Sequence, residues 1–238
     1  SESFNDFFTQ PRILWNSLTP VERQHTIEAF SYQLGKVRSE SVRQQNVNLL
    51  VNVDKELANI VADNIGVERP SGSHVPVSTS YPSLSQANTP KYAYTLTAGV
   101  LVSDGFNGQE VSHVINTLQQ HGVFIMVISE RLGHVNGDDG TQLKVDDTFL
   151  TASPYLVDAL YVVGGNSKHS TRFNQDMMYY INESYKLYKP IGIASTGQSY
   201  LKTSDKNNLA GVVFAANNPN FGNEFVTAIA QMRFWNRI

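Results

Sequence analysis

A serine that could act as a nucleophile stands at the end of one apolar segment. Residues 193–197 read Ile-Ala-Ser-Thr-Gly, which places Ser195 where a strand is expected to turn sharply into a helix. A hydroxyl on such a turn is the arrangement of a nucleophile elbow, whose pattern is Gly-x-Ser-x-Gly. Ile193 occupies the first glycine position, so the pattern is incomplete. A serine here also commonly bonds backbone groups at a helix start, and this second interpretation is the one we favour.

Serine chemistry requires a base, because a hydroxyl is far less acidic than a thiol of pKa ~8.5. Thr196 cannot serve as one, and His169 could approach Ser195 only through the fold. Glu110 lies just beyond another expected strand end and could be a general base or a hydrogen-bonding group. A carboxylate in the first turn of a helix is also favoured by the helix dipole alone, and the spacing favours that simpler role.

Metal and nucleotide sites are not indicated. Gly164-Gly165-Asn166 and the pair Gly105 and Gly108 match neither Gly-x-Gly-x-x-Gly nor a P-loop. The chain has no cysteine, which removes disulfides, thiolate nucleophiles and cysteine-based zinc sites. Its six histidines show no metal-ligand spacing: His25, His74, His113, His121, His134 and His169. We therefore expect no metal and no cofactor-binding residue.

Composition limits the partners. The chain has 238 residues, 41% hydrophobic and 16% charged, with a net charge of -3. These values are typical of a soluble globular protein of one or two domains and give no electrostatic reason to expect nucleic acid or an anionic membrane. No apolar run approaches the ~20 residues that span a bilayer. The start at Ser1 does not look like a signal peptide, and the compartment, cytoplasmic or secreted, stays open.

The first 66 residues are predicted to be helical. Thr19-Pro20-Val21-Glu22 is a capping box with proline at the first helical position, followed by apolar residues at helical spacing. Further helices are expected over residues 39–52 and from Asp54 to Gly66. Three short helices bury little surface by themselves, so we expect them to need a partner. Residues 67–95, rich in proline, serine and threonine, are predicted to be an extended linker that lies on a surface.

Residues 96–238 alternate between short apolar strands and amphipathic helices. This order predicts the α/β class: a flavodoxin-like, doubly wound, mostly parallel sheet with helices on both faces, preceded by the short all-helical segment. Ligand sites in such a sheet lie at the carboxyl ends of strands, where Asp104, Gly164 and Ser195 are expected. The expected strands are 98–102, 123–128, 159–163, 191–194 and 212–214, and the expected helices are 111–118, 173–187 and 225–235.

These strand ends resemble the PfpI-like, glutamine-amidotransferase-like superfamily over roughly residues 97–238. In that superfamily a glutamate follows the first strand, a glycine pair follows a central strand, and a Cys-His-Gly elbow supplies the nucleophile. Glu110 falls at the glutamate, Gly164-Gly165 at the glycine pair, Ser195 at the cysteine and Thr196 at the histidine. The resemblance implies that Glu110, Ser195 and Thr196 are vestigial positions, and we expect no catalytic residue among them.

The first third resembles the end of haem catalases. The residues concerned are Phe4-Asn5-Asp6-Phe7-Phe8-Thr9-Gln10, Leu14-Trp15 and Leu18-Thr19-Pro20-Val21-Glu22-Arg23. Large-subunit catalases, bacterial and fungal, follow these helices with a linker and a PfpI-like domain, and the long Ser/Pro linker favours a fungal member. The resemblance implies a tetrameric parent enzyme that decomposes hydrogen peroxide. Its haem would be held by histidine, asparagine and tyrosine residues of an upstream core, so no haem is expected in this chain.

Three functions remain open. The chain could be an assembly and stability module whose partners are the catalase core of the same chain and neighbouring subunits. It could be a holdase chaperone for unfolded client proteins, which requires an exposed apolar patch. It could also be a residual hydrolase or amidotransferase-type enzyme that uses Ser195 and Glu110. We favour the first two, and expect that the chain itself is not catalytic.

Overall fold

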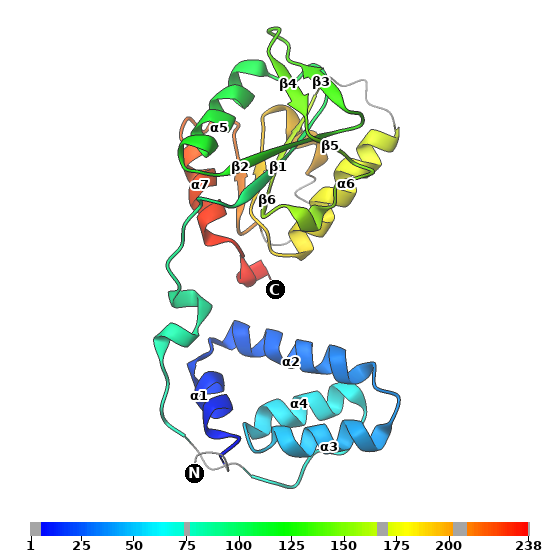
Figure 1. Cartoon of the computed structure of the whole chain (residues 1–238), viewed down its shortest axis with the longest axis vertical. Coiled ribbons are helices and arrows are strands. Elements are labelled where there is room, and N and C mark those ends of the chain that lie inside the picture. The colour runs from blue at the N-terminus through cyan, green and yellow to red at the C-terminus, as the bar shows by residue number, and fades with distance from the viewer. Residues whose placement is uncertain (1–5, 74–76, 166–170, 202–208, 238) are drawn as a thin grey trace. The chain divides into compact units, whose positions relative to one another are not determined.

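The computed structural model describes residues 6–73, 77–165, 171–201 and 209–237. The chain divides into two compact units, residues 1–90 and 91–238. The first is helical and the second contains the sheet, as Figure 1 shows. Each unit is described by itself.

The helical unit contains four α-helices: α1 (Thr9–Ser17), α2 (Pro20–Gly35), α3 (Glu40–Leu50) and α4 (Lys55–Ile65). The predicted capping box is present, since the Thr19 side chain accepts from the Glu22 N–H and the Glu22 carboxylate accepts from the Thr19 N–H. Helix α1 was not among the three helices delimited from the sequence, and no side chain directly before it caps it. Its first turn is instead satisfied by Asp6, whose Oδ1 accepts from the N–H of Thr9 at 3.0 Å.

The four helices enclose a core of their own. Trp15 of α1 packs with residues of α2, α3 and α4, and the buried members are Trp15, Ile27, Val47, Leu50, Val51, Leu57, Ala58, Val61, Ala62 and Ile65. The unexpected α1 thus supplies apolar surface that the other three helices lack. Large apolar side chains remain exposed outside this core, among them Phe7 at 71% and Leu49 at 56%.

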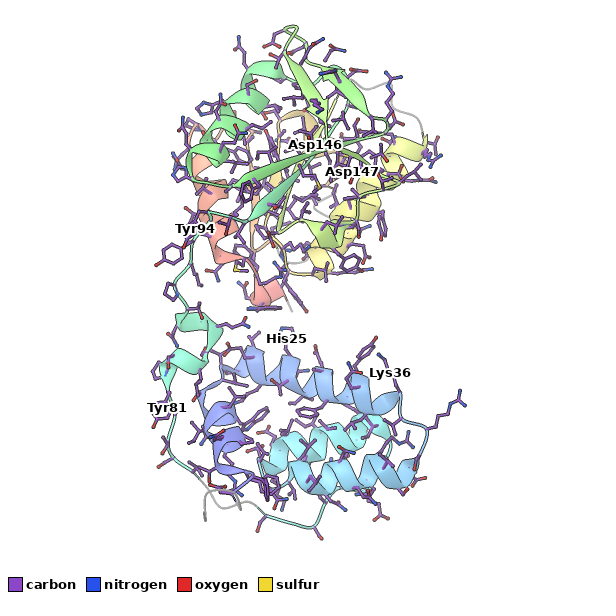
Figure 2. The ribbon with its side chains drawn as sticks, viewed as in Figure 1. His25, Lys36, Tyr81, Tyr94, Asp146 and Asp147 are labelled. Carbon is purple, nitrogen blue, oxygen red and sulfur yellow. The ribbon has the colours of Figure 1, made fainter. Side chains whose placement is uncertain are left out.

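The described residues between 67 and 90 form short 3₁₀ turns, Pro82–Leu84 and Gln86–Asn88, and no longer helix or strand. This segment is bonded to the helical unit. Glu22 accepts from the Ser85 hydroxyl at 2.9 Å and from the Gln86 N–H at 2.7 Å. The Tyr81 N–H donates to the Ser17 hydroxyl at 2.8 Å, and Tyr81 is labelled in Figure 2. These hydrogen bonds hold residues 81–86 against the helices of the same unit.

The second unit is built on a six-stranded sheet of order β5-β2-β1-β6-β7-β8 in which every neighbouring pair is parallel. Without the short edge strand β5, the order follows the flavodoxin-like 2-1-3-4-5 pattern. The predicted fold class is confirmed. The strands are β1 (Thr97–Val102), β2 (Phe124–Ser129), β5 (Asp147–Thr148), β6 (Ala159–Gly164), β7 (Ile191–Ile193) and β8 (Val212–Phe214).

Helices cover both faces of this sheet. Helices α5 (Gly108–Gln120) and α7 (Phe221–Gln231) pack on one face, and α6 (Thr171–Lys186) packs on the other. Side chains alternate accordingly along β6: Tyr161 joins the core under α5 and α7, whereas Val162 joins the core under α6. Because both faces are buried, the strands read as continuous apolar runs.

Two features of this unit differ from expectation. The antiparallel hairpin of β3 (Gly133–Asn136) and β4 (Gln142–Val145), together with β5, lies in polar sequence with no apolar run. Helix α7 ends at Gln231 rather than near residue 235, because Met232 takes a left-handed φ of 62° that stops the helix. Within the described residues, no helix is long and apolar enough to cross a membrane.

Candidate functional site

The candidate site lies where the sheet changes direction. Helix α5 follows β1 onto one face and α6 follows β6 onto the other, so the connections after these two neighbouring strands leave the sheet in opposite directions. This topological switch point is where open α/β sheets bind ligands. Glu110 comes to this edge on the first turn of α5, and Ser195 comes to it directly after β7.

Glu110 is held by the start of α5. Asn107 caps that helix, and its side chain accepts from the Glu110 N–H at 2.9 Å. The Glu110 carboxylate then accepts from the backbone N–H of Ser195 at 2.9 Å, a hydrogen bond between residues 85 positions apart in the chain. The fold thus brings two of the three predicted positions together. Glu110 links α5 to the end of β7, a contact that the solvated-carboxylate interpretation did not include.

Ser195 does not have the backbone of a nucleophile elbow. Its φ of -56° and ψ of -39° are right-handed helical values, and it leads into the 3₁₀ helix Thr196–Tyr200. A nucleophile elbow relies on a strained turn to expose its serine, and that strain is absent at this residue. The capping interpretation is wrong as well, because the Ser195 side chain makes no cap hydrogen bond. Its backbone N–H, and not its hydroxyl, makes the contact with Glu110.

The hydrogen bond to Glu110 also affects what chemistry this edge can support. Backbone N–H groups around a nucleophile usually stabilise the oxyanion of the transition state. Here the Ser195 N–H already donates to a carboxylate, which excludes an oxyanion from that donor. No hydrogen bond joins the Ser195 hydroxyl to any residue in the described ranges, and His169 lies outside them. The arrangement supports a structural contact better than acyl transfer.

Thr196 is also part of the packing. Its hydroxyl donates to the Val163 carbonyl at 2.7 Å, which attaches the turn after β7 to β6. The same turn approaches β6 so closely that a Cβ on Gly197 would lie 2.2 Å from the Val162 carbonyl oxygen. The Thr196 side chain is therefore used for a contact with the backbone.

The glycine pair permits a close approach between β6 and β1. Gly164 has a φ of +69°, and a Cβ on Gly165 would lie 2.4 Å from the Ser103 hydroxyl and 2.6 Å from the Asp104 carbonyl oxygen. The Ser103 N–H also donates to the Gly164 carbonyl at 2.8 Å. These contacts explain the two glycines without a phosphate, and Asn166 lies outside the described residues.

Tyr161 is a further residue of this edge, and sequence reasoning missed it. The side chain is fully buried on β6, with ring centroids 5.8 Å from Phe221 and 6.0 Å from Phe225. Its hydroxyl has no hydrogen-bond partner among the described residues. Burial and the nearby Glu110 charge raise the pKa of Tyr161 well above its ordinary value. The available signal was a single phenol in the aliphatic strand Ala-Leu-Tyr-Val-Val.

The part of the chain that the structure describes has no metal-binding cluster: no group of three or more histidine, aspartate or glutamate residues could hold a metal ion. Burial raises the pKa of Tyr161 and raises that of Tyr180 to about 12. Both phenols are therefore protonated near neutral pH.

The fold and this edge together define a class: a flavodoxin-like α/β domain whose strand-end positions are used for packing, joined to a helical unit. Residues 94–238 match the family described as the C-terminal domain found in long catalases. Residues 1–65 match the family described as catalase-related immune-responsive. The chain belongs to the long-catalase C-terminal domain family.

Several proteins that are named as catalases are similar to this chain. The chain is 41% identical over 237 residues to a catalase of Alkalihalophilus pseudofirmus, covering 100% of this chain and 35% of the relative. It is 39% identical to Catalase-2 of Bacillus subtilis with the same coverage. Catalase-1 of the fungus Neurospora crassa is 25% identical over 84% of this chain and 27% of its own length. The chain thus spans about a third of these relatives, and the bacterial ones share more identity with it than this fungal one.

Proposed function

We propose that this chain is the non-haem end of an enzyme that decomposes hydrogen peroxide, and that the haem is held by a core outside residues 1–238. The observation that carries the proposal is the order of the two family matches, which cover the helical unit and the α/β unit in turn. The coverage of about 35% in the two bacterial relatives leaves room for such a core.

Within that enzyme we propose a role in assembly and stability, with the catalase core and neighbouring subunits of a tetramer as partners. Two observations support a structural role over a catalytic one. The strand-end residues Glu110 and Thr196 are used in internal hydrogen bonds. Large apolar side chains stay exposed on both units, including Phe7 at 71% and Leu150 at 77%. Apolar surface of this kind stabilises a protein when an assembly covers it.

The test uses the full-length enzyme and a version that ends at residue 90. We expect both to decompose peroxide at a similar rate per haem, but the shortened enzyme to lose its activity several times faster on heating and to form fewer tetramers. Light scattering and the half-life of activity at a fixed temperature measure this difference. Equal half-lives would contradict the stability role, and absence of peroxide decomposition by the full-length protein would contradict the catalase proposal itself.

A holdase activity of the separated chain is the second candidate. It is favoured by the apolar residues that the helical unit leaves exposed, such as Leu49 at 56%. The purified chain, added in stoichiometric amount to a heat-stressed client enzyme, should reduce light scattering more than an inert protein does. Replacing Phe7 and Leu49 by serine should weaken that effect. Unchanged aggregation in the presence of wild-type chain would remove the holdase and leave the assembly role unaffected.

A further inference from the structure

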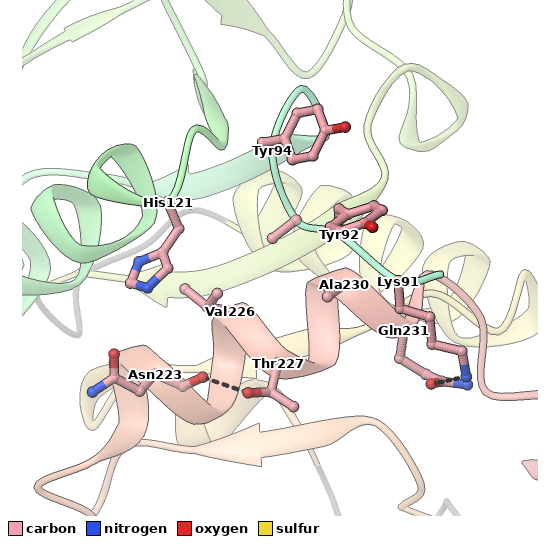
Figure 3. Close-up of a pocket in the computed structure, with 10 residues that line it drawn as sticks. Lys91, Tyr92, Tyr94, His121, Asn223, Val226, Thr227, Ala230 and Gln231 are labelled. Carbon is pink, nitrogen blue, oxygen red and sulfur yellow. Dashed lines mark hydrogen bonds between the residues drawn. The ribbon is translucent and has the colours of Figure 1, made fainter. Parts of the chain in front are cut away.

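The α/β unit carries a groove that the strand-end site does not use. The groove lies between residues 91–94 on one side and α7 on the other, as Figure 3 shows. Its volume is about 610 Å³. Its lining includes Tyr92, Tyr94, His121, Val226, Ala230 and Gln231. Val226 and Ala230 of α7 are partly buried: they line the groove and also pack against the core under that helix.

Two tyrosines form the exposed wall of this groove. Tyr92 and Tyr94 are 58% and 56% exposed, and their ring centroids lie 5.4 Å apart. Val226 and Ala230 present apolar surface opposite them. Aromatic rings beside small apolar groups, with polar groups at the ends, are the composition of protein–protein interfaces and their energetic hot spots.

The turn that holds Tyr94 is strained. Thr95 has a φ of +68°, a left-handed value that is rare for a β-branched residue. The turn is fixed on both sides, because the Thr95 N–H donates to the Gly122 carbonyl at 2.8 Å and the Leu96 N–H donates to the Ala93 carbonyl at 3.2 Å. Strain of this kind persists where the surrounding structure fixes it, and it gathers at binding sites. Here it holds Tyr94 in an exposed position.

Polar groups at the two ends of the groove indicate the chemistry of its occupant. Lys91 donates to the Gln231 side chain at one end. At the other end His121 Nδ1 lies 2.9 Å from the Thr117 carbonyl, which can only accept, so Nδ1 carries the proton. In the neutral ring Nε2 is then an acceptor. No carboxylate lines the described groove, so an occupant with a carboxylate facing Lys91 and a donor facing His121 would complement it.

We propose that this groove docks a segment of the catalase core, the polypeptide outside residues 1–238, through an apolar side chain placed against Tyr92 and Tyr94 and a carboxylate facing Lys91. This inference rests on the proposed function. About two-thirds of the bacterial relatives lies outside the matched region, which supplies the partner. A second copy fits less well, because a symmetric contact pairs the same surface with itself and this one has no carboxylate for Lys91.

The first test places a photo-crosslinking amino acid at Val226 in the full-length enzyme. Irradiation should join Val226 to peptides outside residues 1–238, identified by mass spectrometry. The control carries the same group at Tyr179, a 51% exposed residue of α6 on the opposite face of the sheet, and should give no such product. Crosslinks from Val226 only to residues 1–238, or none at all, would overturn the docking site.

The second test replaces Tyr92 and Tyr94 by alanine in the full-length enzyme and measures amide hydrogen exchange in residues 223–231. Docking should slow this exchange in the wild type relative to the 238-residue chain, and the double variant should lose about tenfold of that protection. A matched control replaces Tyr155 and Tyr179, which are 61% and 51% exposed elsewhere on the same unit. Equal protection in the two double variants would overturn the proposal.

The two proposals fail separately. A full-length protein that decomposes peroxide but gives no crosslink from Val226 would remove the docking site and leave the proposed function in place. A protein that gives the crosslink but does not decompose peroxide would keep the docking surface and remove the catalase activity. Peroxide decomposition per haem should stay unchanged in the control variant at Tyr155 and Tyr179, because these residues lie outside the proposed docking surface.

Discussion

The α/β unit contains two surfaces that use similar residues in opposite ways. At the strand ends, the side chains of Glu110 and Thr196 hydrogen-bond to the backbone of the same domain. Along α7, Tyr92 and Tyr94 are ordered by local structure but remain more than half exposed. The first surface resembles an active site in its position and acts as a packing contact. The second has no catalytic pattern and is the surface that we propose as the docking site.

The comparison shows that the position of a residue in the fold and its hydrogen-bond partners must be considered together. A switch point in a parallel sheet is where ligands bind, so residue placement alone favours the strand ends. The hydrogen bonds argue against a ligand site at the strand ends, because the Ser195 N–H already donates to Glu110 within the domain. Exposed apolar surface that local strain keeps in place is, by contrast, a signal for binding. The predictions below would each break or sharpen this contrast.

Replacing Gly165 by alanine should have the largest effect. The new Cβ would lie 2.6 Å from the Asp104 carbonyl oxygen, so β6 and β1 would have to move apart at the strand ends. Overpacking of this kind costs about 3 kcal/mol of unfolding free energy. Urea unfolding measures the loss. Alanine at Gly35 is the control, since its Cβ would meet nothing within 4 Å. A fully stable Gly165→Ala variant would mean that the strand ends are not tightly packed.

Glu110→Ala and Ser195→Ala should separate a structural contact from a catalytic one. The Glu110 variant leaves the Ser195 N–H without its charged acceptor, which should cost about 2 kcal/mol of unfolding free energy. The Ser195 variant keeps its N–H and should change stability by less than about 0.5 kcal/mol. Any esterase or peptidase turnover should be equally absent from the wild type and both variants. Turnover that disappears with Ser195 alone would restore the hydrolase interpretation.

Tyr161→Phe should raise the stability of the domain. The Tyr161 hydroxyl is buried without a partner, so removing it relieves a desolvation penalty of about 1 kcal/mol. Tyr155→Phe is the matched control, because the exposed Tyr155 hydroxyl donates to Glu183 at 3.2 Å and gains nothing by removal. Thermal unfolding of both variants measures the difference. A loss of stability in Tyr161→Phe would show that this hydroxyl has a function in the strand-end surface.

The sequence predicted more of the fold than of either surface. Apolar runs and helical spacing predicted the main strands and α2, α3 and α4, because those signals are local. The sequence did not predict α1, because its first turn is bonded to Asp6 and not to a residue directly before the helix. The contact between Glu110 and Ser195 joins residues 85 positions apart, and sequence alone cannot show which atoms meet.

The groove could not be predicted from the sequence for a related reason. Threonine is not a residue that predicts a left-handed turn, so nothing in the sequence around Thr95 indicated its φ of +68°. Its other wall, α7, was expected to continue to about residue 235. The turn at Met232 that ends it depends on a second left-handed residue that is not glycine. Backbone conformations of this kind are set by tertiary contacts and not by local propensity.

Thr95→Gly should have the smallest effect and the most informative one. Glycine adopts a φ of +68° without strain, which should add about 1 kcal/mol, while its greater freedom in the unfolded chain should remove about half of that gain. The net rise in unfolding free energy should therefore be about 0.5 kcal/mol. Hydrogen exchange of residues 223–231 in the full-length enzyme should stay protected, because Tyr94 keeps its place. A less stable variant would mean that the threonine side chain is needed in the turn, and that the groove is not held under strain.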